Sequence, residues 1–162
     1  MILYEIPRQA RQADAPFSVY GSDPACDQPC RPLRVEPGLR FHLPQGAHLI
    51  STQLSGGSLP LYLKEQRRLW GESLWLLIEP MCHLFPLPCP DGVGREIEAE
   101  ESRRLQAARC CYHAPEFLCQ YCVLRENGQL AVHLFDTEQT LGEKLALAKR
   151  LEIINIIYIM LS

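Results

Sequence analysis

Cysteine is the side chain in this sequence with the widest chemistry, and the chain has eight of them in 162 residues. A thiolate can bind a metal ion, attack an electrophile or form a disulfide, and its neighbours decide among these roles. Roughly 5% cysteine is below the 8–10% typical of small disulfide scaffolds. The cysteines divide four and four around a charged segment at 95–109, so the sequence contains two candidate ligand sets.

The second set is the stronger candidate for a metal site. Cys119 and Cys122 form a C-x₂-C pair, and three further potential ligands lie six to nine residues upstream of Cys119. Tetrahedral Zn²⁺ takes four nitrogen or sulfur ligands. The sequence therefore predicts a structural zinc ion bound by four of six residues, which are Cys110, Cys111, Cys119, Cys122, His113 and His133. Two alternatives stay open for these cysteines: thiols packed as small hydrophobic side chains, and redox activity.

His133 enters this set through a predicted β-hairpin. Asn127 and Gly128 are the residue pair favoured in two-residue type I′ turns, and alternating apolar residues flank them on both sides. Counting outward from the turn pairs Cys122 with His133, with Cβ atoms roughly 5 Å apart. This spacing favours His133 as a ligand.

The first set gives a weaker prediction of a second metal site, formed by Cys26, Cys30, Cys82 and Cys89. Fifty-one residues separate the second member from the third, so the sequence does not join them. Unrelated thiols and a disulfide are the alternatives. The disulfide is disfavoured because the chain is expected to be intracellular and reduced.

Most catalytic motifs are absent from the sequence. It has no GxSxG, P-loop, dinucleotide-binding fingerprint or HExxH motif. His113 and Glu116 lack the spacing of zinc deaminases, and a C-x-x-C pair that precedes a hairpin does not fit the thioredoxin pattern. No small-molecule substrate site is evident. A thiol or metal enzyme stays open as an alternative, because a Cys–His pair can meet in space rather than in sequence.

Charge gives a second alternative. The chain has 16 Lys and Arg against 19 Asp and Glu, so no overall basic surface marks it as nucleic-acid binding. Locally, arginines and aromatic residues gather around the second cysteine set and could contact single-stranded RNA or DNA. These residues are Arg103, Arg104, Arg109, Tyr112, Phe117 and Tyr121.

The distribution of proline and charged residues separates the chain into two regions, whose elements must position these side chains. Twelve of 13 prolines lie within 1–90, so the region 1–94 is expected to contain short strands and loops with one helix at about 59–79. A strand is predicted at 39–43, with 47–54 as its hairpin partner. Ser58 is the predicted N-cap of the helix, and Pro80 its stop.

The region 95–162 is expected to contain a solvated helix at 95–109, the cysteine-rich hairpin and a C-terminal amphipathic helix. The last helix is predicted from apolar residues spaced three or four apart, at 141, 145, 148, 151, 154, 158 and 161. Its stripe is either core or a docking surface for a protein partner.

Together these patterns predict a single domain, 1–162, of α+β class with short strands, a zinc-stapled β-hairpin and the C-terminal helix. No signal peptide or membrane span is expected, which favours a cytoplasmic location. The predicted function is a non-enzymatic, zinc-stabilised binding module that acts as an adaptor or regulatory subunit.

Overall fold

A parallel sheet of four strands lies at the centre of the structure, a computed structural model that describes residues 1–23, 30, 32–54, 56–107, 109–126 and 128–161. The strand order is β1-β12-β6-β5, and every neighbouring pair is parallel. The strands are β1 Ile2–Ile6, β5 His48–Ser51, β6 Leu74–Ile78 and β12 Asn155–Ile159. All five residues of β6 are buried, as expected for a parallel strand that is covered on both faces.

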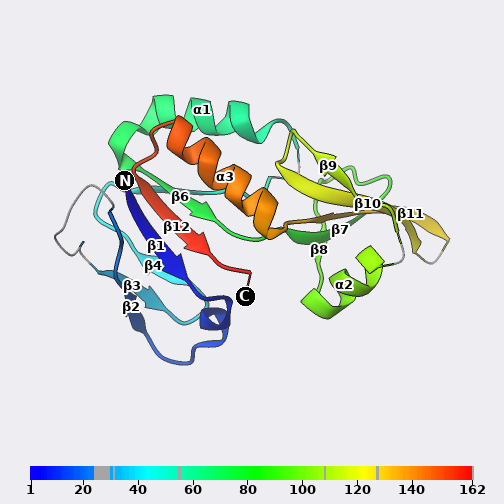
Figure 1. The fold of residues 1–162 in the computed structure, drawn as a ribbon, viewed down its shortest axis with the longest axis horizontal. Helices are drawn as coiled ribbons and strands as arrows, with labels where there is room; N and C mark the ends of the chain where they lie inside the picture. The colour runs from blue at the N-terminus through cyan, green and yellow to red at the C-terminus, as the bar shows by residue number, and fades with distance from the viewer. Residues whose placement is uncertain (24–29, 31, 55, 108, 127, 162) are drawn as a thin grey trace.

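Two helices cover one face of this sheet and a small antiparallel sheet covers the other (Figure 1). The helices are α1 Leu59–Trp70 and α3 Glu138–Arg150. The small sheet has the order β2-β3-β4, with bounds Phe17–Val19, Leu33–Glu36 and Arg40–His42. Alternate residues of β6 divide between the two cores: Leu76 packs with the helices, whereas Leu77 packs with the small sheet. Short 3₁₀ turns follow β1 at Arg8–Gln12 and α1 at Gly71–Ser73.

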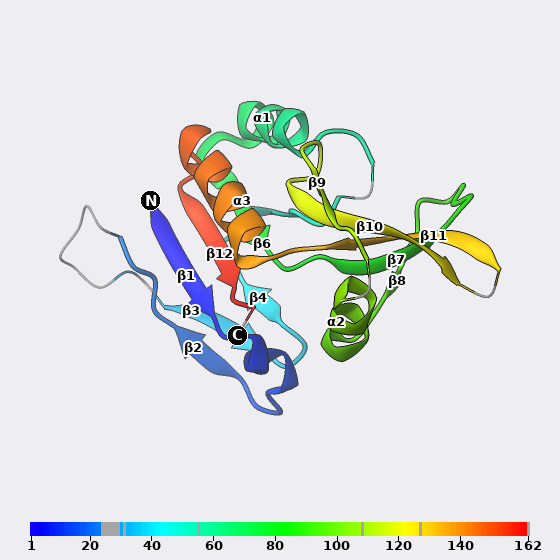
Figure 2. The same cartoon turned by 45° about the vertical axis from the view of Figure 1, so that its right-hand side comes forward.

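A second sheet of five strands is inserted in the chain between β6 and α3. Its order is β8-β7-β11-β10-β9, and every neighbouring pair is antiparallel. Helix α2, Ala99–Ala107, packs on one face of it, as Figure 2 shows from a second direction. The strands are β7 Cys82–Pro86, β8 Arg95–Glu96, β9 Tyr112–Ala114, β10 Cys119–Glu126 and β11 Gln129–Phe135.

The α+β class is confirmed, with three helices and several sheets in the described part of the chain. The predicted hairpin is confirmed too: its register pairs Cys122 with His133 and Leu124 with Ala131. The turn residue Asn127 lies outside the described residues. A zinc staple on this hairpin is not shown.

Two predicted helices are too long. The helix predicted at 59–79 ends at Trp70, and its last turns are strand β6 instead. The C-terminal helix ends at Arg150, and the isoleucine-rich segment after it is strand β12, buried in the sheet. In both places a short run of bulky apolar residues has apolar positions three or four apart, which matches the period of a helix. The run forms a strand instead, and it is apolar throughout because both faces of the strand are covered.

Two smaller predictions are also corrected. The segment 47–54 is not the hairpin partner of the strand at 39–43, because β5 pairs in parallel with β6 while β4 pairs with β3. The charged helix predicted at 95–109 is shorter, since residues 95 and 96 belong to β8. Among the helices described, none has the length and apolar character that a bilayer span requires.

Candidate active site

The C-x₂-C pair does not act as a zinc knuckle, because both cysteines lie within one strand. Residues three apart in a strand point to opposite faces of the sheet. Cys119 is buried with Met81 and Leu134, whereas Cys122 is buried in the core beneath α2. Burial raises the pKa of Cys119 to about 12, so its thiol is protonated at neutral pH.

The structure brings together three of the six predicted zinc ligands, namely Cys111, Cys122 and His133. The Cys122 sulfur lies 3.9 Å from His133 Nδ1. Burial raises the pKa of Cys122, and the neighbouring Cys111 thiol adds to this effect. His113 lies elsewhere, with its Nε2 2.9 Å from Glu143 Oε2, and Cys110 is exposed. Across the residues that the structure describes, no group of three or more His, Cys, Asp or Glu side chains is arranged to hold a metal ion.

The first cysteine set is dispersed. Cys26 lies outside the described residues, and Cys30 is half-buried ahead of β3. Cys82 begins β7, whereas the Cys89 thiol donates to Asp91 Oδ1 at 3.4 Å in the loop that follows. Cys30, Cys82 and Cys89 therefore do not form a shared ligand set.

The arginines and aromatic residues predicted to contact nucleic acid do not share one surface. Arg103 lies on α2, and Arg109 donates to the Leu105 carbonyl at 3.0 Å. Tyr112 and Tyr121 pair with ring centroids 5.6 Å apart. Tyr121 points away from α2, because it alternates with Cys122 along β10. Of the remaining two, Arg104 is exposed on α2 and Phe117 packs on the core around Cys119.

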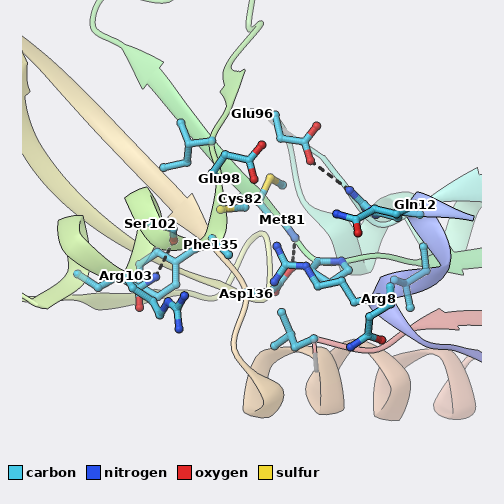
Figure 3. A pocket seen from close by; sticks show the side chains of 18 residues that line it. Arg8, Gln12, Met81, Cys82, Glu96, Glu98, Ser102, Arg103, Phe135 and Asp136 are labelled. Carbon is cyan, nitrogen blue, oxygen red and sulfur yellow. Dashed lines mark hydrogen bonds and ion pairs between the residues drawn. The ribbon is translucent and has the colours of Figure 1, made fainter. Parts of the chain in front are cut away.

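A groove lies at the carboxyl edge of the parallel sheet. Its cavity of about 740 Å³ is lined on one side by segments that follow β1, β6 and β12, and on the other by α2 and the five-stranded sheet. Figure 3 shows Arg8, Cys82, Glu96, Glu98 and Arg103 around it. Ligands of open parallel sheets bind outside the carboxyl ends of the strands, so this groove is the candidate active site.

A smaller cavity of about 380 Å³ shares residues Arg11, Glu96 and Ile159 with the first. Arg11 joins two carboxylates here: its Nη2 lies 3.4 Å from Glu79 Oε2, and its Nη1 lies 3.2 Å from Glu96 Oε1. Ser51 donates to the other oxygen of Glu79 at 2.7 Å. Arg11 Nε is buried and has no hydrogen-bond partner in the described part of the protein.

These contacts define what the groove can do chemically. Because Glu79 and Glu96 bind one guanidinium group, their nearest oxygens lie within roughly 9 Å of each other, a limit that covers the carboxylate separations of glycosidases. Paired carboxyl groups can donate a proton to a leaving oxygen and activate a water molecule or attack carbon. The smaller cavity beside the groove therefore contains two carboxyl groups of the kind that acid–base hydrolysis uses.

A buried ion pair fixes the floor of the groove. Lys144 Nζ, on α3, donates to Asp136 Oδ2 at 2.6 Å, and both side chains have no exposed surface. Thr140 Oγ1 donates to the other oxygen of Asp136 at 2.8 Å, and the Met81 amide donates to Oδ2 at 2.7 Å. This network joins α3, the end of β11 and the segment between β6 and β7.

A second buried polar contact holds α2 on the five-stranded sheet. Ser102 Oγ lies 3.2 Å from His133 Nε2, and Gln106 donates to Ser102 at 2.8 Å. Burial lowers the pKa of His133 to about 4, so its ring is neutral at physiological pH. Ser102 and Gln106 also line the groove, so this contact supports one of its walls.

Sequence reasoning missed Arg11, Glu79 and Glu96. One signal pointed to Glu79: it directly follows the uninterrupted apolar run of β6, at the carboxyl end where parallel sheets carry functional groups. The prediction of a helix at 59–79 includes this apolar run, so it does not place Glu79 at the end of a strand.

No family model matches this chain, and no curated protein matches it. Among solved structures it is similar to the spore cortex-lytic enzyme SleL of Bacillus megaterium QM B1551, with 12% identity and a TM-score of 0.52. The same enzyme of Bacillus cereus is similar with 14% identity and a TM-score of 0.53. Each match covers 70% of this chain and 30% or 31% of the other chain. At these identities the likeness shows the fold.

These findings overturn the prediction of a non-enzymatic, zinc-stabilised binding module. The fold is shared with part of lytic enzymes, and the described cysteines and histidines form no metal-binding group. The adaptor or regulatory role rested on the ligand set, the missing catalytic motifs and the apolar C-terminal stripe, and it is corrected together with the module. The nucleic-acid alternative depended on the same zinc knuckle. It is corrected too, because both cysteines of the C-x₂-C pair lie in the extended strand β10.

Proposed function

We propose that this chain is a carbohydrate-active enzyme domain, and that its groove binds a wall polysaccharide of the spore-cortex kind. One observation carries the proposal: the Glu79–Arg11–Glu96 set lines the smaller cavity, which shares Arg11 and Glu96 with the groove at the carboxyl edge of the parallel sheet. The fold likeness to spore cortex-lytic enzymes supports the choice of substrate class.

The groove walls suit a glycan chain. Sugar hydroxyl groups both donate and accept hydrogen bonds, so they need amide, carboxylate and guanidinium partners close together. The lining provides amides from Gln9, Gln12 and Gln106, together with the charged groups already described. An extended polymer can lie along the boundary between the two sheets, where the two cavities share lining residues.

Hydrolysis would use the two carboxyl groups in different roles. One protonates the glycosidic oxygen as the bond breaks, and the other activates water or attacks the anomeric carbon. Glu79 is held by Ser51 and Arg11, which fixes its carboxylate relative to the sheet. Glu96 is 62% exposed on β8 and can reach a substrate in the groove.

The test measures reducing ends released from purified spore-cortex polymer and from chitin, together with cosedimentation of the protein. Glu79→Gln is expected to lower release at least ~100-fold while retaining cosedimentation, because it removes an acid–base group and keeps the shape. Glu72→Gln is the matched control, since Glu72 is exposed at the opposite end of β6. Equal release by wild type and Glu79→Gln, or neither release nor cosedimentation with either polymer, would overturn the proposal.

A further inference from the structure

Cys111 directly precedes β9, and Cys122 lies in the neighbouring strand β10. The antiparallel register pairs Gln120 with His113 and Tyr121 with Tyr112. One further step of the same ladder would place Cys111 opposite Cys122, and the neighbouring Cys111 thiol adds to the effect of burial in raising the pKa of Cys122. Directly opposed residues in antiparallel strands have Cα atoms roughly 4.5–5.5 Å apart, which lies within the range that a disulfide spans.

The two thiols differ in access to solvent. Cys111 is exposed, and its Sγ lies 3.9 Å from the Arg109 carbonyl oxygen. Cys122 has no exposed surface and lies in the core beneath α2. An oxidant in solution therefore reaches Cys111 first, and Cys122 is placed to complete the bond.

The other described cysteines are less well placed to pair with Cys122. Cys119 lies on the opposite face of β10. On its other side, Cys122 faces His133 of β11 rather than a cysteine. Cys110 is exposed, but it lies one residue beyond the ladder position opposite Cys122.

We propose that Cys111 and Cys122 form a cross-strand disulfide when the protein meets a small disulfide oxidant such as oxidised glutathione. The Cys111 thiolate attacks one sulfur of the oxidant and displaces one thiol, which leaves a mixed disulfide. Cys122 attacks the Cys111 sulfur, the second thiol leaves, and the proton of Cys122 passes to this departing sulfur. Two protein thiols are oxidised and one oxidant disulfide is reduced to two thiols, so electrons balance.

The bond would fasten an edge strand to the sheet. β9 has three residues and pairs with β10 alone among the described strands. Closing a loop from 111 to 122 restricts the unfolded chain. The oxidised protein is therefore expected to unfold at a higher urea concentration than the reduced protein.

The test incubates the reduced full chain with oxidised glutathione, alkylates free thiols and digests with trypsin and a glutamate-specific protease. Cleavage after Arg109, Glu116 and Arg125 separates peptide 110–116 from peptide 117–125. The expected result is a disulfide between these two peptides, with loss of 2 Da and recovery of both peptides after reduction. Alkylation of both Cys111 and Cys122 in the oxidised sample, or glutathione retained on Cys111 without the cross-link, would overturn the proposal, whereas Cys110 and Cys119 are alkylated in either case.

Single substitutions assign the bond. Cys111→Ser is expected to lower the rate of cross-linking at least tenfold, whereas Cys110→Ser, its exposed neighbour, leaves the rate unchanged. Cys119→Ser is expected to retain the cross-link, because Cys119 lies on the other face of the strand. Circular dichroism confirms that each variant folds. A cross-link that persists in Cys111→Ser and disappears in Cys110→Ser would contradict the pairing.

Discussion

His133 is a fully buried histidine with a neighbour at each ring nitrogen, Cys122 on one side and Ser102 on the other. The sequence identified the first neighbour because turn geometry fixes the hairpin register. It did not identify the second, since Ser102 comes from a helix 31 residues away. Local rules predict contacts within a hairpin, whereas contacts between elements depend on packing that one sequence does not specify.

Protonation of His133 is expected to destabilise the protein in mild acid. The unfolded chain binds this proton near pH 6.5, whereas the folded protein binds it only near pH 4. Stability is therefore lost as the pH falls through this window, by about 2 kcal/mol between pH 7 and pH 5. Urea unfolding at several pH values measures the loss.

A pair of histidine variants isolates this effect. His133→Gln should flatten the dependence between pH 7 and pH 5, while His42→Gln should retain it, since the His42 side chain is 59% exposed. The same pH dependence in wild type and His133→Gln would show that other groups cause it.

The zinc prediction failed at the same scale. C-x₂-C places two thiols on one ion when the backbone turns between them, but an extended backbone separates them across a sheet. The alternation of Cys122, Leu124, Ala131 and His133 around the turn already indicated strands. A strand that extends back to Cys119 places Cys119 and Cys122 on opposite faces of the sheet, which is incompatible with a zinc knuckle.

At the scale of elements, the helix boundaries were the weakest part of the sequence prediction. Gly71, with φ +53°, ends α1, and glycine adopts a positive φ without the steric cost of a side chain. The Ile-rich segment after α3 has β-branched residues typical of strands. Both signals were in the sequence, but the apolar periodicity of the longer helices outweighed them.

Two glycines offer a matched pair of substitutions with opposite expected effects. Gly128 has φ +83° in the hairpin turn, so Gly128→Ala is expected to destabilise the protein by about 1 kcal/mol. Gly142 lies within α3 with open space where a Cβ would be, so Gly142→Ala is expected to stabilise it by about 0.5–1 kcal/mol. Thermal unfolding measures both. Changes of the same sign would contradict the assigned turn or helix.

At the scale of the whole molecule, the two large sheets meet at the buried pair of Asp136 and Lys144. Lysine at position 144 lay on the predicted helix but carried no sign of burial, because a lone charged residue usually faces solvent. The groove was unpredictable for a related reason: its walls come from segments far apart in the chain. The sequence predicted pieces of both walls without their juxtaposition.

Lys144→Met is expected to destabilise the protein by about 3–5 kcal/mol, because it leaves the Asp136 carboxylate buried without its cation. The double variant Asp136→Asn/Lys144→Met should lose less than the sum of the single variants, since no unpaired charge remains. Lys149→Met, an exposed position on the same helix, serves as the control. If urea unfolding gives the same loss of stability for Lys144→Met and Lys149→Met, the role assigned to the Asp136–Lys144 pair is contradicted.

Strand β12 lies between β1 and β6. The last of the four strands to be synthesised is therefore an inner strand of this sheet. Ile2 pairs with Asn155, and β1 has no other neighbour in its sheet within the described residues. At ribosomal speeds of about 5–20 residues per second, β1 waits roughly 10 s or longer for this partner. During each round of synthesis an apolar strand with a free edge is therefore available to chaperones, or to a second nascent copy.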